Sequence, residues 1–282
     1  MSSFDELLEG LEKISGEIPV DVESLNFYIE LLRKQEILKK KFLEKFKGKV
    51  DKEKIKAALK EGKPAITVKD VFVLDESDLA DAFTEISMFV QALRPKQKEE
   101  IKRFLQALGS GAFTLNELVV SVLSGKDDIT RGIAAGANID LDMVQVLVLW
   151  TLQPILEAFS EVLQGSVDFA VWDKGYCPVC GGYTRLGYLT GPGGRQYLKC
   201  QICGHEWYFP RLACPFCGNN ESGQIGFYTI GGDKRFRLYV CKKCGRYWKV
   251  VDENVAGTEV PRKLYDVWTL KLDMFAREKN MK

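Results

Sequence analysis

Histidine is almost absent from this sequence, and cysteine is absent from its first 176 residues. His205 is the only histidine, and no Ser/His/Asp set or paired-carboxylate motif is visible. Neither a Walker A nor a GxGxxG motif occurs, and the stretches GSGAF and GPGG are typical of glycine turns rather than of phosphate-binding loops. We therefore predict no catalytic residues and no cofactor-binding residues.

Targeting and membrane-spanning segments are also missing from the sequence. The N-terminal stretch MSSFDE lacks the basic and apolar regions of a signal peptide. The longest apolar stretch, residues 143–156, is interrupted by glutamine and threonine and is too short to span a bilayer. We therefore expect no membrane insertion and a cytoplasmic location. In that compartment thiols stay reduced, and cysteine pairs more often bind metal.

What is present is an ordinary globular composition with an uneven distribution of charge. The chain has 282 residues, 46% of them hydrophobic and 28% charged, which is enough for a buried core. The net charge is +1, yet residues 171–249 hold twelve basic and only four acidic residues. Residues 1–170 therefore carry a negative excess. The basic part could bind nucleic acid or an acidic protein surface, or the two halves could pack against each other.

Hydrophobic periodicity divides the chain into a helical part and a part rich in hairpins. Residues 1–170 show helical patterns, and Pro154 within the most apolar one predicts a kink or a stop. After about residue 170, short aromatic and β-branched runs alternate with glycine turns, and a helical stripe returns over 259–279. We predict an α plus small β protein. Its expected domains are a helical domain 1–170, two ribbons 171–210 and 211–252, and a C-terminal helix 253–282.

The eight cysteines form four CxxC pairs, and a glycine follows each pair. The pairs are Cys177/Cys180, Cys200/Cys203, Cys214/Cys217 and Cys241/Cys244. Two thiolates three residues apart can face one metal ion only if the chain turns tightly, and glycine adopts the backbone conformation that such a turn needs. Backbone N–H groups in the turn can also face the sulfurs. The pattern therefore predicts metal-binding turns of the zinc-ribbon or rubredoxin type.

Two such turns complete a tetrahedral site with four sulfurs, so four turns predict two sites. Consecutive, interleaved and nested groupings are all conceivable. Nineteen residues separate Cys180 from Cys200, and 23 separate Cys217 from Cys241; both gaps resemble the spacing in a ribbon. Only ten residues separate Cys203 from Cys214, which suits a connector. The spacing favours two consecutive ribbons, 177–203 and 214–244.

Several alternatives compete with metal binding. Structural disulfides are disfavoured by a reducing compartment. A redox CxxC pair opens a helix after a strand, whereas these pairs lie among hairpin signals. Each site with four cysteines is closed and is expected to be structural, with zinc or iron as the metal. His205, two residues after Cys203, is interpreted as a surface residue of the turn because four thiolates already fill the site.

The order of motifs resembles the C-terminal region of the formate dehydrogenase accessory protein family, FdhE. The resemblance is carried by WDKGYCPVCGG, LKCQICGHEWYFPRLACPFCGN, YVCKKCGRYWKVVD and DVWTLKLDMFAREKN. It extends over about 171–279 and is weaker over 1–170. It implies a helical region before two rubredoxin-like metal ribbons and a cytoplasmic accessory protein rather than an enzyme. It also implies a partner, the catalytic subunit of formate dehydrogenase, and iron in the ribbons.

Nucleic-acid binding by the ribbons is the alternative function. It rests on the basic excess of 171–249 and on interleaved aromatic residues, which could stack on bases. These are Tyr183, Tyr197, Trp207, Tyr208, Phe236, Tyr239 and Trp248. The competing explanation is that these rings fill the small cores of the ribbons. Electron transfer through rubredoxin-type iron is a weaker possibility.

Overall fold

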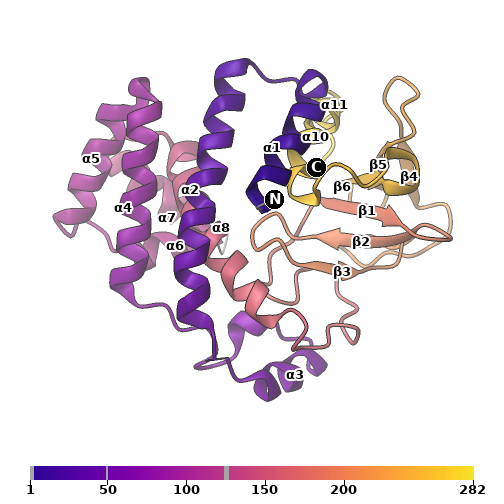
Figure 1. Cartoon of the computed structure of the whole chain (residues 1–282), viewed down its shortest axis with the longest axis horizontal. Coiled ribbons are helices and arrows are strands. Elements are labelled where there is room, and N and C mark those ends of the chain that lie inside the picture. Colours follow the sequence, from indigo (N-terminus) through magenta and orange to yellow (C-terminus); the bar gives the residue numbers. More distant parts are fainter. Residues whose placement is uncertain (1–2, 49, 124–126) are drawn as a thin grey trace.

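A computed structural model describes residues 3–48, 50–123 and 127–282 of the chain. Its first part is helical, as predicted (Figure 1). The helices are α1 Ser3–Ile14, α2 Val22–Phe46, α3 Lys52–Lys60, α4 Glu76–Leu93, α5 Lys98–Gly109, α6 Leu115–Leu123, α7 Asp127–Gly136 and α8 Leu141–Leu163. The segment after α3 contains a 3₁₀ turn, Ala65–Thr67, followed by turns.

Helix α8 is the centre of the helical core. It packs along α2, and its Phe159 makes edge-to-face contacts with Phe46 and Phe72, with ring centroids 5.7 and 5.1 Å apart. The helix continues through Pro154, so the predicted stop is wrong. By length and composition α8, which extends beyond the stretch 143–156 at both ends, could cross a bilayer. However, 61% of its most apolar window is buried inside the protein, as in a core helix.

The described residues after α8 form one mixed sheet of six strands. The strands are β1 Leu186–Thr190, β2 Arg195–Lys199, β3 Glu206–Tyr208, β4 Ile225–Tyr228, β5 Phe236–Cys241 and β6 Tyr247–Asp252. Their order is β3-β2-β1-β6-β5-β4. Neighbouring strands within each ribbon pair antiparallel, whereas β1 and β6 pair in parallel, with Gly187 opposite Val250. The two ribbons therefore share one sheet, and the predicted fold class is confirmed.

The C-terminal helical stripe is interrupted rather than continuous. Short helices α9 Glu253–Ala256 and α10 Tyr265–Trp268 precede α11 Leu270–Glu278. Thr269 separates α10 from α11, and its buried hydroxyl donates to the carbonyl of Tyr265 at 2.7 Å. Side chains such as Leu264, Trp268 and Leu272 still share one buried face, which packs on the sheet and on α1.

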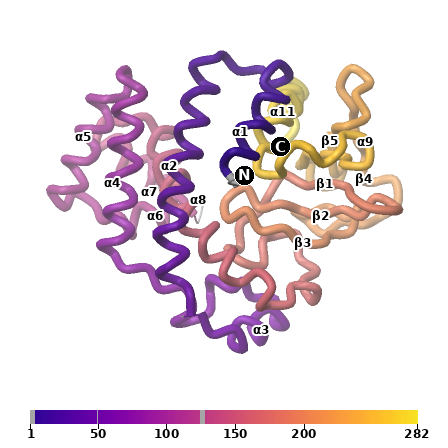
Figure 2. Tube along the Cα trace, viewed as in Figure 1, coloured from indigo at the N-terminus to yellow at the C-terminus, as the bar shows by residue number. Residues whose placement is uncertain are grey.

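Helix α1 joins this C-terminal part of the molecule, as Figure 2 shows for α1 beside α11. Leu11 and Ile14 of α1 are buried in one cluster with Phe236 of β5 and Trp268 of α10. The indole N–H of Trp268 also donates to Glu17, at 3.3 Å. Residues from both ends of the chain therefore form a common core, and the domain limits stay a prediction.

Lys249 of β6 ties the C-terminal helices to the sheet. Its side chain is 1% exposed, and its Nζ donates to Asp266 Oδ1 and Asp273 Oδ2, each at 2.6 Å. Burial acts to lower the pKa of Lys249, but the two carboxylates outweigh burial and hold the pKa above its usual value. An unpaired ammonium at this depth would cost several kcal/mol, so the carboxylates are required for its burial.

Removing this ammonium should destabilise the protein. We expect Lys249→Ala to cost about 3 kcal/mol, because two carboxylates lose their partner and a cavity opens. The midpoint of thermal unfolding, followed by circular dichroism, should fall by roughly 5–10 °C. Lys234→Ala, at an exposed position between β4 and β5, is the matched control and should leave the midpoint unchanged. Equal midpoints for the two variants would contradict the role given to Lys249.

Candidate metal centres

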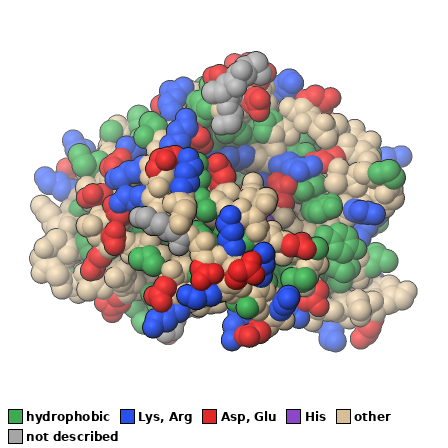
Figure 3. All heavy atoms as spheres, turned by 60° about the horizontal axis from the view of Figure 1, so that its bottom comes forward, with side chains coloured by type: hydrophobic (Ala, Val, Ile, Leu, Met, Phe, Trp, Pro, Cys, Tyr) green, Lys and Arg blue, Asp and Glu red, His purple; other side chains and the backbone are tan. Residues whose placement is uncertain are grey.

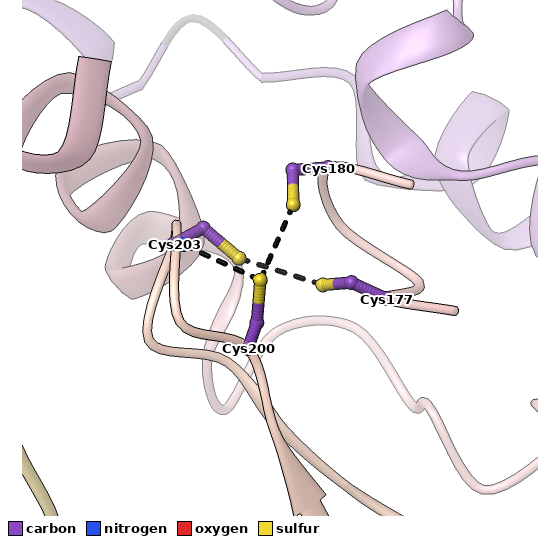
Figure 4. A group of neighbouring side chains, drawn as sticks. All are labelled: Cys177, Cys180, Cys200 and Cys203. Carbon is purple, nitrogen blue, oxygen red and sulfur yellow. Dashed lines mark hydrogen bonds between the residues drawn. The ribbon is translucent and has the colours of Figure 1, made fainter. Parts of the chain in front are cut away.

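The first four cysteines converge on one point. Cys177 and Cys180 come from the turn before β1, and Cys200 and Cys203 come from the turn after β2. In Figure 4 the four side chains point toward one another from these two turns. The Sγ atoms of Cys177 and Cys203 are 3.4 Å apart, and those of Cys180 and Cys200 are 3.5 Å apart. We call this group cluster 1.

The other four cysteines form cluster 2 in the same manner. Cys214 and Cys217 precede β4, and Cys241 and Cys244 lie at the end of β5 and just after it. The Sγ atoms of Cys214 and Cys244, and those of Cys217 and Cys241, are 3.7 Å apart. The cysteines therefore meet in the consecutive grouping that the spacing predicts, and not in the interleaved or nested one.

A glycine with positive φ closes each turn. The φ angles of Gly181, Gly204, Gly218 and Gly245 lie between 69° and 76°, a region that side chains rarely adopt. In the first turn the N–H of Gly181 donates to the carbonyl of Cys177 at 2.9 Å, and the N–H of Cys177 donates to Gly182 at 2.9 Å. The corresponding hydrogen bonds recur in the other three turns. The predicted role of the glycines is confirmed.

The distances between sulfurs fit a shared metal ion. Four sulfurs about 2.3 Å from a tetrahedral zinc ion are about 3.8 Å from one another, close to the separations within each cluster. A disulfide would require about 2.0 Å, and all eight cysteines are free. Backbone N–H groups of Val179 and Ile202 approach the sulfurs of Cys177 and Cys200 at 3.4 Å. Each cluster could therefore hold one metal ion.

The thiols of cluster 1 influence one another's ionisation. Burial raises the pKa of Cys177 and of Cys203 well above the usual value for a thiol. The pKa of Cys200 is instead well below it, because hydrogen bonds from the neighbouring thiols stabilise its thiolate. A cation placed among them would favour the thiolate form of all four, since a thiolate is the species that binds a metal.

The two clusters differ in their surroundings. Cluster 1 lies against the helical region, where the N–H groups of Ala65 and Ile66 donate to the carbonyls of Pro178 and Val179 at 2.8 and 2.9 Å. Three of its cysteines are buried. In cluster 2, Cys217 is exposed. Solvent therefore reaches cluster 2 more easily than cluster 1.

His205 is not a surface residue, so the interpretation from the sequence is wrong. The side chain is buried between Phe169 and Trp207, with ring centroids 4.3 and 6.5 Å away. Among the residues that the structure describes, neither ring nitrogen has a hydrogen-bond partner. Burial lowers the pKa of His205 to about 4, so the ring is neutral at neutral pH. Phe169, which covers it, lies far away in the sequence.

Asn219 is a polar neighbour of cluster 2 that the cysteine motifs do not reveal. The side-chain amide of Asn219 lies 3.9 Å from the Sγ of Cys241, and the carbonyl of Asn219 accepts the N–H of Cys214 at 2.8 Å. Asn219 is buried, although it lies in an apparently ordinary turn, CGNN. Its position directly after Gly218 was the available signal, because the residue after a metal-binding turn lies close to the sulfurs.

The charge asymmetry is reflected in contacts between the two halves. Glu17 pairs with Arg235 at 2.9 Å, and Glu157 of α8 pairs with Lys263 at 2.8 Å. On the face drawn in Figure 3, basic and acidic side chains lie interspersed. Of the three explanations left open by the sequence, the Glu17–Arg235 pair supports packing of the acidic half against the basic half, whereas Lys263 lies beyond the basic segment 171–249.

Comparison with known proteins places the chain among proteins of similar sequence and fold. No family model matches it. A protein described as an FdhE homolog, from Aquifex aeolicus (strain VF5), is 27% identical over 232 residues, which are 81% of this chain and 75% of that protein. The predicted resemblance to the FdhE family is confirmed. FdhE from Escherichia coli O127:H6 is 29% identical over 79 residues, which are 27% of this chain and 25% of that protein.

The solved structures agree on the fold. The crystal structure of the FdhE protein from Pseudomonas aeruginosa matches with a TM-score of 0.66 and 19% identity. The match covers 99% of this chain and 92% of that one. The similarity therefore includes the helical region, where the sequence resemblance is weak, as well as the ribbons.

For protein loaded with a metal ion in each cluster, we expect two phases of release to a chelator. Cluster 2 should empty first, because Cys217 is exposed. Release can be followed with a chromogenic chelator, and Cys217→Ser should abolish the fast phase while Cys203→Ser abolishes the slow one. Release of both equivalents in a single phase would contradict the inferred difference between the clusters.

Proposed function

We propose that this protein is a non-catalytic accessory factor that binds the catalytic subunit of formate dehydrogenase during its maturation in the cytoplasm. The resemblance to proteins named FdhE carries the proposal. The nature of the clusters supports it, because four cysteines close a tetrahedral site and leave no position for a reacting water or substrate. The clusters would then shape a binding surface rather than perform chemistry.

The eight cysteines are proposed as the ligands of two metal ions, zinc or iron. The ribbons have little core of their own, since cluster 2 is surrounded by a small group that includes Leu189, Tyr239 and Trp248. Metal binding to such modules is worth about 10–16 kcal/mol, which would offset the small apolar burial. The ions would hold the turns in place, and the chain would supply every ligand.

Metal analysis tests this part of the proposal. Protein purified without added metal should contain two equivalents per chain. Cys177→Ser and Cys214→Ser should each reduce the content to one equivalent, because each variant disrupts one cluster. A conservative control, Ser222→Ala, lies outside both clusters and should keep two equivalents. The element found separates a structural zinc role from a redox role of iron, and a content below one equivalent in the unmodified chain would contradict the proposed sites.

A cleft between the helices and the ribbons is the proposed contact surface. It has a volume of about 430 Å³, and residues from α2, α8, the turn of cluster 1 and the segment before α11 line it. Lys39 and Glu161 form an ion pair at 2.6 Å on its wall, and the Glu161 side chain is 44% exposed. Mixed polar and apolar walls of this kind suit a protein segment that offers both kinds of side chain.

Retention of the catalytic subunit on the immobilised full chain tests the accessory role. Glu161→Lys should weaken retention, because it reverses one charge on the cleft wall. Glu53→Lys is the matched control: Glu53 also pairs with a lysine, Lys56 at 2.7 Å, but lies on α3 outside the cleft. Retention of the control should equal that of the unmodified chain. If the unmodified chain retains no catalytic subunit while both proteins are folded, the accessory role is wrong.

The nucleic-acid alternative receives less support. Of the seven interleaved aromatic residues, Trp207, Phe236, Tyr239 and Trp248 are buried. Tyr239 and Trp248 fill the small core beside cluster 2, whereas Trp207 and Phe236 belong to the cores shared with the helices. Several basic residues of 171–249 are engaged in ion pairs with acidic residues. These are Lys199, Arg235, Arg237 and Lys249. These four cations are therefore less available to a phosphate backbone.

A further inference from the structure

A pocket opens on the ribbon surface between the turns of the two clusters. Five residues line it: Tyr183, Arg185, Phe216, Arg246 and Lys282. Its volume of about 490 Å³ lies within the range of small-molecule sites. Three of the lining side chains are basic and two are aromatic. The pocket lies apart from the cleft proposed for the partner subunit, and no residue is common to the two linings.

Most residues that line the pocket belong to the cysteine turns or follow them closely in the sequence. Tyr183 follows the first turn and forms a β-bridge with Tyr176. Phe216 lies inside the third turn, between Cys214 and Cys217. Arg246 follows the fourth turn, and its carbonyl accepts the N–H of Cys241 at 3.0 Å. The conformation of the clusters therefore determines where these side chains lie.

A close backbone contact brings the turns of the two ribbons together. A Cβ atom at Gly175 would lie 1.9 Å from the carbonyl oxygen of Pro215, so only glycine permits this approach. Across the contact, the rings of Tyr183 and Phe216 stack with centroids 6.1 Å apart and planes inclined by 29°. Tyr183 is 54% exposed, which leaves part of its ring available to a ligand.

The three cations of the pocket have no acidic partner. Among residues 3–48, 50–123 and 127–282, no ion pair involves Arg185, Arg246 or Lys282. The guanidinium groups of Arg185 and Arg246 instead lie over the rings of Tyr247 and Phe216, 4.6 and 5.3 Å from the ring centroids. Three positively charged side chains that line one pocket would attract an anion from solution.

We propose that this pocket binds a free nucleoside phosphate. Arginine guanidinium groups match phosphate oxygens in pairs, and lysine adds a further positive charge. An exposed aromatic ring can stack on any nucleobase, because every base has a flat aromatic face. The phosphate would contact Arg185, Arg246 and Lys282, and the base would stack on Tyr183. Side chains make this site, so it needs none of the glycine-rich loop motifs that the sequence lacks. The inference is independent of the accessory role.

Titration calorimetry of the metal-loaded full chain tests the ligand class. ADP should bind saturably at low ionic strength, and higher salt should weaken the binding because exposed charges are screened. Adenosine lacks the phosphates, and inorganic pyrophosphate lacks the base. Each should bind about tenfold more weakly than ADP, since each loses one of the two kinds of contact.

Matched substitutions test the location. Tyr183→Ala should weaken ADP binding about tenfold, whereas Tyr208→Ala, at a similarly exposed tyrosine (53%) of β3, should not change it. Arg246→Gln should weaken binding several-fold, whereas Lys234→Gln, at an exposed position outside the pocket, should leave it unchanged. Metal content and circular dichroism establish that each variant is folded. If a pocket variant fails to fold, the comparison of ADP with adenosine and pyrophosphate on the unmodified chain still tests whether a nucleoside phosphate is the ligand.

Four outcomes would overturn the inference. These are the absence of saturable ADP binding, equal affinity for ADP and pyrophosphate, equal effects of Tyr183→Ala and Tyr208→Ala, and much tighter binding of a single-stranded oligonucleotide than of ADP. The last outcome would assign the pocket to nucleic acid instead of a free nucleotide.

Discussion

The parallel pairing of β1 with β6 joins the two cysteine ribbons into one body. Each ribbon forms its own antiparallel hairpin, but a small ribbon buries little apolar surface by itself. All residues of β6 are buried, and Trp248 stacks on Tyr239 with ring centroids 5.3 Å apart. Lys249 of the same strand anchors the C-terminal helices through two carboxylates. The sheet, the last helices and the positions of both clusters therefore depend on this pairing.

Two clusters of the same chemistry occupy different environments in this arrangement. Cluster 1 hydrogen-bonds through its turn to the segment after α3 and lies beside the core around α8, so it links the helical region to the sheet. Cluster 2 lies in the turns beside β4 and β5 and has one exposed cysteine. A buried site and a more accessible site would allow one chain to combine a fixed framework with a surface open to ligands.

Opposite charges also link the helical region to the part of the chain that contains the sheet. Acidic residues of the helical region pair with basic residues beyond residue 230, as Glu17 does with Arg235 and Glu157 with Lys263. Such pairs are individually weak when they are exposed. Their main effect is to position one half on the other. Arg185, Arg246 and Lys282, which form no ion pair among the residues that the structure describes, stay available to bind an anion from solution.

The sequence by itself determined the local chemistry of the clusters. A CxxC pair followed by glycine determines a turn within a few residues, so the eight cysteines, their grouping and the helical character of the first part were predictable from spacing and periodicity. Contacts between distant residues were decided only by the tertiary structure. The β1–β6 pairing joins segments about 60 residues apart, and the burial of His205 depends on Phe169. The paired burial of Lys249 and the pocket at Tyr183 likewise require several elements to be packed, and no local pattern encodes which surfaces will meet.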